Sequence, residues 1–255
     1  MSNLKNKLQN FKKRKEQITC LTCYDSSFSK ILNDSKIDIV LVGDSLGMVI
    51  KGKENTHSVT MDEILYHSKC VSTYKENFIL MADMPINSYD NIDIATLNAK
   101  KLLEQEVDIV KVEYQDKHFE VIKGFVNAKI PVCAHIGYLP QKSKNEEDIR
   151  IYGKDKKEKE KLLNQAKLLE SIGIDIILLE CVDSDLANTI TRSLITPVIG
   201  IGSGEGCDGQ VQVLYDLIGV SKNPPKFSKN YLANGNNIPE AIRNFYNYVK
   251  GINRK

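Results

Sequence analysis

The chain has 255 residues, enough to bury one sizeable core, and we expect a single domain. Its 35 Lys and Arg residues nearly balance 33 Asp and Glu residues. The formal charge of +2 therefore excludes a global field that would attract nucleic acid or an anionic membrane, so we expect a small-molecule partner.

Targeting and membrane signals are not visible in the sequence. The basic segment 1–17 lacks the apolar core of a secretory signal, and its early acid and single arginine make a poor transit peptide. Charges interrupt every later apolar run before it is long enough to span a bilayer. We expect a cytoplasmic location.

The six cysteines include one close pair, Cys20 and Cys23. Residues three apart in a strand point to opposite faces, so this pair is a poor chelator and a poor redox couple. We expect six reduced thiols, several of them buried.

Along the chain one unit repeats: a short apolar run, turn residues, and then a segment with apolar residues at helical spacing. Segments such as 92–106 and 159–173 have apolar stripes and charged backs, which predict helices that cover a sheet. The runs that predict strands are ITCLTC (18–23), DIVLVG (38–43), FILMAD (78–83), DIVKVE (108–113), PVCAHIG (131–137), IDIILLE (174–180), PVIGIG (197–202) and GQVQVLY (209–215).

Eight apolar strands that alternate with helices predict a parallel sheet closed into a (β/α)₈ TIM-type barrel. A Rossmann-type fold is the alternative, but the only glycine-dense turn, 200–206, does not satisfy G-x-G-x-x-G. That turn is more typical of a tight strand-to-helix connection than of a phosphate cradle. We therefore expect one barrel domain over 1–255, with the basic segment 1–17 and a C-terminal helical tail, 238–255.

Polar residues stand at the carboxyl end of six of the eight runs. In a barrel these ends converge at the mouth, where active sites are built. The alternative is that each acid or serine only caps the following helix. The residues are Asp44, Asp83, Lys111, Glu113, His135, Glu180 and Ser203.

Several carboxylates in one mouth repel one another unless a cation or a protein base compensates them, which indicates a bound metal. The candidate ligands Asp44, Asp83 and Glu113 offer only oxygen, so a hard ion such as Mg²⁺ is expected. A 2-oxo acid could chelate that ion through its carboxylate and keto group, and the neighbouring carbon would then lose a proton more easily.

Glu180 closes a strongly apolar run and is the candidate proton acceptor, the alternative being a structural pair with a lysine. Lys111 could stabilise substrate carboxylate or enolate charge. His135 could donate a hydrogen bond to the substrate or relay a proton, or it could be a satisfied structural residue. His57, His67 and His118 carry no spacing signal, and we expect them to face solvent or an interface.

With these positions assembled, the chain resembles the ketopantoate hydroxymethyltransferase family. The matching stretches run in unbroken order from the first strand to Tyr231. They are TCYDSSFSKIL, IDIVLVGDSLGMVIKG, VTMDEILYHSKCV, MADMPINSY, VKVE, PVCAHIGYLPQ, LLECV, PVIGIGSGEGCDGQVQVLYDLIG and PKFSKNY.

The resemblance implies a cytoplasmic homo-oligomer, typically a decamer, that transfers a one-carbon unit from 5,10-methylenetetrahydrofolate to 3-methyl-2-oxobutanoate. It implies Mg²⁺ on Asp44 and Asp83 with Glu113 close by, and Glu180 as proton acceptor. Substrate contacts would come from Asp44, Ser45, Asp83 and Lys111.

Three stretches depart from the family pattern: Tyr114-Gln115 replaces Gly-Gly, Ile86 replaces phenylalanine, and the charged run 142–161 replaces a glycine-rich stretch. We expect this run to be a solvated loop entering a helix, with a mobile lid as the alternative. Two other functions stay open: a Mg²⁺-dependent lyase or mutase of the phosphoenolpyruvate mutase and isocitrate lyase type, and a non-catalytic metal-binding barrel. The loop after the fifth run lacks the cysteine that such lyases commonly use, which favours hydroxymethyl transfer.

Overall fold

In the computed structural model, which describes residues 3–143 and 148–252, eight parallel strands close into a barrel in chain order. The last strand pairs with the first, which completes the ring. The predicted (β/α)₈ architecture is confirmed. The strands are β1 (Ile18–Thr22), β2 (Ile39–Val42), β3 (Ile79–Asp83), β4 (Ile109–Glu113), β5 (Val132–Gly137), β6 (Ile176–Glu180), β7 (Val198–Ile201) and β8 (Gly209–Gln212).

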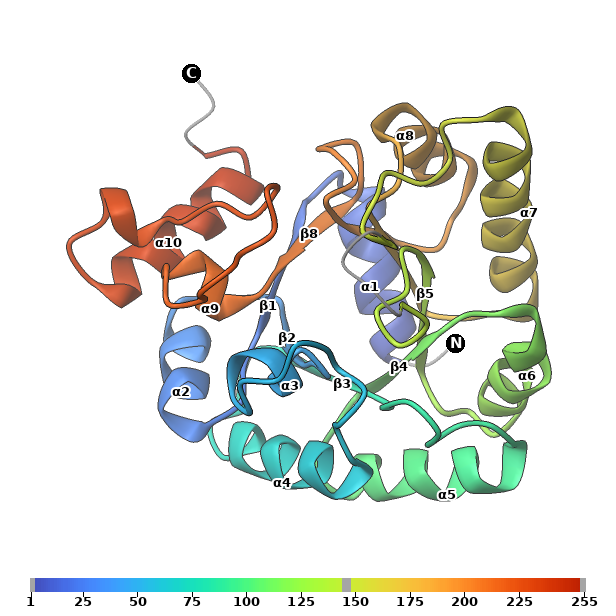
Figure 1. Cartoon of the computed structure of the whole chain (residues 1–255), viewed down its shortest axis with the longest axis horizontal. Helices are drawn as coiled ribbons and strands as arrows, with labels where there is room; N and C mark the ends of the chain where they lie inside the picture. Colours follow the sequence, from blue (N-terminus) through green and yellow to red (C-terminus); the bar gives the residue numbers. More distant parts are fainter. Residues whose placement is uncertain (1–2, 144–147, 253–255) are drawn as a thin grey trace.

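Helices surround the strands and follow them in chain order (Figure 1). Helices α9 and α10 lie together on one side of the barrel (Figure 1). The α-helices are α1 (Asn3–Lys13), α2 (Ser26–Asp34), α3 (Leu46–Val49), α4 (Met61–Ser72), α5 (Ile92–Leu103), α6 (Phe119–Asn127), α7 (Lys156–Ile172), α8 (Ser184–Ser193), α9 (Leu214–Leu217) and α10 (Ile238–Val249). Within the described residues, the 3₁₀ turn η1 (Asp116–His118) lies between β4 and α6, and η3 (Leu232–Asn234) lies between α9 and α10.

Every predicted run contains a strand, but the eighth prediction was too long. Gly209–Gln212 forms β8, whereas Leu214 and Tyr215 already belong to α9. The backbone N–H of Leu214 donates to the side-chain oxygen of Thr22, 3.0 Å away, at the point where the chain leaves the barrel. An apolar strand end and the first turn of a buried helix have the same composition, so periodicity alone does not separate them.

The two faces of the barrel strands bury two separate apolar clusters, since successive side chains alternate across a strand. Cys20 lies in the inner cluster and Cys23 in the outer one, so the two thiols face opposite ways as predicted. Five of the six cysteines are buried, and Cys70 is half-buried. The outer cluster joins the strands to the helices, whereas the inner cluster fills the lower part of the barrel.

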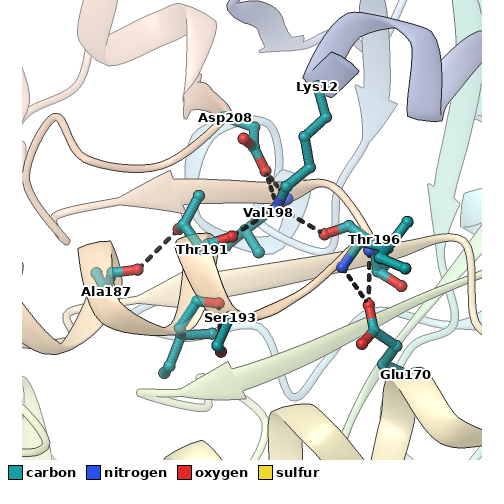
Figure 2. Close-up of polar contacts among 10 residues, drawn as sticks. Lys12, Glu170, Ala187, Thr191, Ser193, Thr196, Val198 and Asp208 are labelled. Carbon is teal, nitrogen blue, oxygen red and sulfur yellow. Dashed lines mark hydrogen bonds and ion pairs between the residues drawn. The ribbon is translucent and has the colours of Figure 1, made fainter. Parts of the chain in front are cut away.

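Helix α1 closes the barrel at the amino ends of its strands. Leu8 is fully buried in the inner cluster, and Leu4 and Phe11 pack against it. The ammonium group of Lys12 donates to the carbonyl oxygens of Thr191 and Thr196, at 2.7 and 3.2 Å, and to Asp208 at 2.8 Å. Figure 2 shows Lys12 reaching from α1 toward these partners. The basic segment at the start of the chain is therefore a structural part of the barrel.

The long helices begin at polar residues that satisfy their first backbone N–H groups. Thr60 and Glu63 form a reciprocal capping box at the start of α4. Side chains of Asp25, Asn91, Asp155, Asp183 and Asn237 cap α2, α5, α7, α8 and α10. None of these capping residues is a predicted site residue.

Helices α7 and α10 confirm the predictions of a helix at the end of the charged run 142–161 and of an amphipathic C-terminal helix. Within that charged run, residues 144–147 lie outside the described residues. In the described part of the chain, none of the helices combines the length and apolarity that crossing a membrane requires.

Candidate active site

On four neighbouring strands, the inward-facing side chains change from apolar to polar toward the carboxyl end of the strand. Alternation places the polar members directly above the apolar ones, so the inner cluster becomes the floor of a charged chamber. These series are Ile79, Met81 and Asp83 on β3; Ile109, Lys111 and Glu113 on β4; Cys133 and His135 on β5; and Ile176, Leu178 and Glu180 on β6.

Lys111 and Asp83 form the central ion pair of this chamber. Parallel pairing sets them opposite each other on β3 and β4, and the Lys111 ammonium donates to Oδ1 of Asp83. Both residues are buried, at 6% and 2% exposure. Burial alone would lower the pKa of Lys111, but the nearby Asp83 and Asp44 carboxylates raise it above its ordinary value, so this lysine stays charged.

Asp44 joins this pair from the turn after β2. Its backbone N–H donates to Oδ2 of Asp83 over 2.9 Å. The preceding Gly43 leaves room for the Ser45 hydroxyl, because a Cβ at position 43 would lie only 2.9 Å from Ser45 Oγ. Burial and then the Asp83 charge raise the pKa of Asp44 to about 7.

Glu113 lies above Lys111 on β4 and is 2% exposed. Its Oε1 accepts the backbone N–H of Gln141 at 3.0 Å, whereas its Oε2 has no hydrogen-bond partner among the described residues. Burial and then the Asp44 charge raise the pKa of Glu113 well above its ordinary value. A buried carboxylate oxygen without a donor is a costly feature, and it indicates a position for a bound group.

Glu180 is the most accessible of the four carboxylates, with a side chain 17% exposed. Gly137, at a φ of +100° on the neighbouring strand, lets the Tyr138 N–H donate to the Glu180 carbonyl at 2.8 Å. A Cβ at Gly137 would collide with that carbonyl oxygen. Among the described residues no lysine forms an ion pair with Glu180, whose carboxylate lies beside His135 instead, so the alternative of a structural pair with lysine is not supported.

His135 is fully enclosed, and burial lowers its pKa although Glu180 opposes the shift, so the ring is neutral. Its Nε2 lies 3.3 Å from Oε2 of Glu180, yet within the described residues neither ring nitrogen makes a hydrogen bond of acceptable geometry. The His135 ring is close to Glu180 but is not aligned for a hydrogen bond, so both ring nitrogens stay without a partner in the described chain. Within the described residues, the geometry thus favours the interpretation of His135 as a substrate or proton-relay group over that of a satisfied structural histidine.

Ser45 and Ser203, the two serines at strand ends, differ in their surroundings. Ser45 is half-buried beside Asp44, and its hydroxyl contacts the Tyr24 hydroxyl at 2.8 Å. Ser203 is buried, accepts the Val182 N–H at 3.0 Å and donates to the Leu179 carbonyl at 3.0 Å. Ser203 thus braces the turn after β6, and its hydroxyl is already engaged.

The alternative that these acids cap helices is not supported by the structure. Asp44 is followed by Ser45 at the start of the short α3, where no side-chain cap forms. The helix after Glu180 is capped by Asp183. The acids at the strand ends are instead held against one another, against Lys111 and against Gln141.

Two buried residues of this region were missed or misplaced by sequence reasoning. Gln141 is 7% exposed and donates from Nε2 to Oδ2 of Asp44 at 2.8 Å. His118 is 3% exposed, donates from Nδ1 to the Glu113 carbonyl at 2.8 Å, and packs on Tyr89. The expectation that His118 faces solvent or an interface was wrong, because η1 folds back under the end of β4.

Comparison with known proteins bears on the chemistry of this chamber. Residues 3–253 match the family model described as ketopantoate hydroxymethyltransferase. The chain belongs to this family. It is 43% identical to 3-methyl-2-oxobutanoate hydroxymethyltransferase of Ruthia magnifica over 244 residues, which is 95% of this chain and 94% of that protein. It is 41% identical to the Marinobacter nauticus protein of the same name, over 96% of this chain and 93% of that one.

Solved structures with the same fold are far more distant in sequence. A 2,3-dimethylmalate lyase of the PEP mutase/isocitrate lyase superfamily superposes with a TM-score of 0.62 at 13% identity, over 82% of this chain and 80% of that one. A phosphonopyruvate hydrolase gives 0.62 at 10% identity, over 83% and 81%. These likenesses show the fold alone.

The lyases considered as an alternative commonly use a cysteine in the loop after the fifth strand. Cys133 precedes that loop and is buried inside β5, where burial raises its pKa to about 12, so this thiol is not a nucleophile.

Of the departures from the ketopantoate hydroxymethyltransferase pattern, Tyr114 lies outside the charged chamber. Tyr114 is 3% exposed and packs in the outer cluster, because it follows the inward-facing Glu113 and points the other way. Ile86 is half-buried beyond the end of β3. Tyr114 therefore acts on the helix layer and does not shape the mouth directly.

The donor set suits the Mg²⁺ ion that the family resemblance implies. If ionised, the carboxylates of Asp44, Asp83, Glu113 and Glu180 exceed the single positive charge of Lys111, and the Glu113 Oε2 is unpartnered. Among the described residues no three His, Cys, Asp or Glu side chains converge into a complete metal site. Mg²⁺ commonly takes one or two protein carboxylates and fills its other positions with water and substrate oxygens, so the residues fit.

Proposed function

We propose that this chain transfers a hydroxymethyl group from 5,10-methylenetetrahydrofolate to 3-methyl-2-oxobutanoate and thereby forms ketopantoate. The observation that carries the proposal is a buried ion pair, Lys111 with Asp83, set among three further carboxylates of which only Glu180 is partly open to solvent. The relatives named 3-methyl-2-oxobutanoate hydroxymethyltransferase, similar along nearly the whole chain, support the substrate assignment.

Asp44, Asp83 and Glu113 would hold Mg²⁺, and when bound the ion would polarise the keto group of the oxo acid and acidify its C3 proton. Asp44 and Glu113 are the better-placed ligands. Within the described residues no hydrogen bond reaches Oδ1 of Asp44 or Oε2 of Glu113, whereas both oxygens of Asp83 already accept a bond. Asp83 would then contribute a further lone pair while it holds Lys111 in place.

The protein's own groups divide the remaining work. Lys111, held charged by Asp83, would bind the substrate carboxylate and stabilise negative charge on the enolate. Glu180 would take the C3 proton, and neutral His135 beside it would bind substrate oxygen or pass on a proton through a ring nitrogen that has no other partner. Ser45 would contact the oxo acid through its hydroxyl.

The proposed hydroxymethyl transfer breaks and forms the following bonds. The C3–H bond of the oxo acid breaks and its electrons form a C–C bond to the methylene carbon of the folate. One of the two bonds from that carbon to the folate nitrogens breaks when the C–C bond forms, and the other breaks when water supplies the hydroxyl group. The C3 proton and the remaining proton of water pass to the two nitrogens that are released. The acceptor carbon then carries two methyls, the new hydroxymethyl group and the carbonyl carbon, so it has no proton left and cannot enolise again.

We also infer a cytoplasmic location and assembly into a homo-oligomer, with a decamer as the family's typical form. The six free cysteines, which are typical of a reducing compartment, support the location. No nucleic-acid or membrane partner is expected from a formal charge of +2.

A direct assay tests the proposed function. Purified protein is supplied with Mg²⁺, 3-methyl-2-oxobutanoate and 5,10-methylenetetrahydrofolate, and ketopantoate is quantified by mass spectrometry. We expect product that depends on both substrates and disappears when EDTA is added. Cleavage of a 2,3-dialkylmalate in place of ketopantoate formation would instead favour the lyase alternative.

A further inference from the structure

Gln141 stands at the centre of a hydrogen-bond network that none of the proposed roles includes. It lies in the loop after β5, far in sequence from the acids it contacts, and is 7% exposed. Its backbone N–H donates to Oε1 of Glu113 at 3.0 Å. Its side-chain Nε2 donates to Oδ2 of Asp44 at 2.8 Å and to the Met84 carbonyl at 3.0 Å, and its Oε1 accepts the Tyr89 hydroxyl at 2.6 Å.

The orientation of the Gln141 amide follows from the chemistry of its neighbours. The Met84 carbonyl oxygen can only accept, so the amide atom 3.0 Å from it must be the nitrogen. The amide oxygen then faces Tyr89, which donates its hydroxyl proton. Burial and then the Glu113 and Asp44 charges raise the pKa of Tyr89 above its ordinary value, so the phenol keeps that proton.

Tyr89 is itself fixed by its surroundings. It is 4% exposed, and its ring meets the ring of His118 edge to face with centroids 4.8 Å apart. His118 in turn is held by the Glu113 carbonyl at 2.8 Å. The phenol therefore has little freedom to turn away from Gln141.

Gln141 thus occupies one oxygen of each of two neighbouring carboxylates. It holds Oδ2 of Asp44 with its side chain and Oε1 of Glu113 with its backbone, and Oε2 of Glu113 stays unpartnered within the described chain. A glutamine suits this position because it is neutral and can donate to a carboxylate while it accepts from a phenol. A glutamate would add a further negative charge, and an apolar residue would leave Asp44 and Tyr89 unsatisfied.

We propose that Gln141 is a positioning residue that presents the remaining oxygens of Asp44 and Glu113 to Mg²⁺, and that Tyr89 acts through Gln141 by fixing its amide. The proposal rests on the proposed function in that it takes these carboxylates as the Mg²⁺ ligands. Hydrogen-bond partners of metal ligands typically change metal affinity about 10- to 100-fold when they are removed.

The test measures Mg²⁺ binding to the full chain by calorimetry, without substrates, well below the thermal unfolding midpoint of each variant. Gln141→Met keeps the side-chain length and removes the amide, and we expect Mg²⁺ affinity to fall about 10- to 100-fold. Tyr89→Phe removes only the hydroxyl and should lower the affinity by a smaller factor. Matched controls are Gln9→Met and Tyr231→Phe, which alter a buried glutamine and a buried tyrosine outside the chamber and should bind Mg²⁺ like the wild type.

A double-variant cycle separates positioning from general damage. Because Tyr89 acts through Gln141, adding Tyr89→Phe to Gln141→Met should cause no further loss of Mg²⁺ affinity. Fully additive losses, or wild-type affinity in folded Gln141→Met, would overturn the proposal. Should Gln141→Met fail to fold, unchanged affinity in Tyr89→Phe would overturn it alone. Wild-type protein that binds Mg²⁺ as expected but forms no ketopantoate would refute the proposed function and leave this inference standing.

Discussion

Among the single residues of the chamber, Glu180 differs from the other acids in being partly accessible, with a side chain 17% exposed. Asp83 is tied to Lys111, and Asp44 and Glu113 are both bound by Gln141. A carboxylate that is neither tied to a cation nor enclosed can accept and release a proton within each turnover. This difference in environment separates the proposed base from the acids proposed to bind the metal and the substrate.

Glu180→Gln is expected to abolish exchange of the C3 proton of 3-methyl-2-oxobutanoate with solvent, because an amide cannot take up the proton. Mg²⁺-dependent binding of the oxo acid should persist, since Glu180 is not among the proposed ligands. Exchange is followed by NMR in deuterated buffer and binding by calorimetry. Exposed Glu54→Gln serves as the control and should exchange normally. Undiminished exchange in Glu180→Gln would remove this residue from the base role.

His118 gives the fold a pH dependence that can be isolated. Burial lowers its pKa below the ordinary value, so the unfolded chain binds this proton more readily than the folded chain. The stability from neutral His118 is therefore complete above about pH 6.5 and is lost as the pH falls through the lowered pKa. We expect the free energy of unfolding to drop more between pH 7.5 and 5 in the wild type than in His118→Gln.

Urea unfolding at the two pH values measures this difference. Exposed His57→Gln should keep the wild-type pH dependence, because its ring lies outside the core. Equal losses in wild type and His118→Gln would show that the imidazole contributes nothing to it.

At the scale of elements, the strands were predictable because most are short runs that are largely apolar on both faces, and the acids at their ends stand out against that background. The positions of Asp44, Asp83, Lys111, Glu113, His135 and Glu180 in one chamber follow from strand alternation and barrel closure alone. Their individual roles in metal and substrate binding stay predictions.

Other features depend on contacts between distant segments. Gln141 lies in a loop, and the loop conformation that places it beside Asp44 produces no periodic hydrophobic pattern in the sequence. Helix α1 has the composition of a solvated basic segment, yet its few apolar residues are those that close the barrel. His118 is buried by a 3₁₀ turn too short to produce a pattern. Local sequence can indicate such segments as polar, but not what they contact.

Helix α1 offers a prediction at this scale. Lys12→Met removes the donor shared by two carbonyls and Asp208, and Asp208 keeps only the Val198 N–H at 2.9 Å. We expect the free energy of unfolding to fall by about 1–3 kcal/mol, below the cost of breaking a fully buried pair, because the side chains are 17% and 15% exposed. Urea unfolding measures the loss, and Lys7→Met on the exposed side of α1 is the control. Equal stability of both variants would contradict the role of Lys12.

For the whole molecule, exposed apolar side chains favour the proposed homo-oligomer. Ile94 and Leu97 on α5 are 47% and 56% exposed, and Met48 and Ile50 near α3 are 47% and 41% exposed. Surfaces with such residues are often covered in assemblies. Light scattering coupled to size-exclusion chromatography should give a mass several times that of one chain, ten times for the family's typical form. A single-chain mass at micromolar concentration would contradict the proposal.

Helix α1 closes the barrel at the amino ends of its strands. Because Leu8 is fully buried at the amino end of the barrel, the described residues leave the carboxyl end as the route to Asp83 and Lys111, the predicted keto-acid contacts. Under the proposed function, we expect the small keto acid to bind before the bulky folate and the products to leave in the reverse order. Product-inhibition patterns in steady-state kinetics would distinguish this ordered binding from random binding. Random binding would show that bound folate does not block access of the keto acid to the chamber.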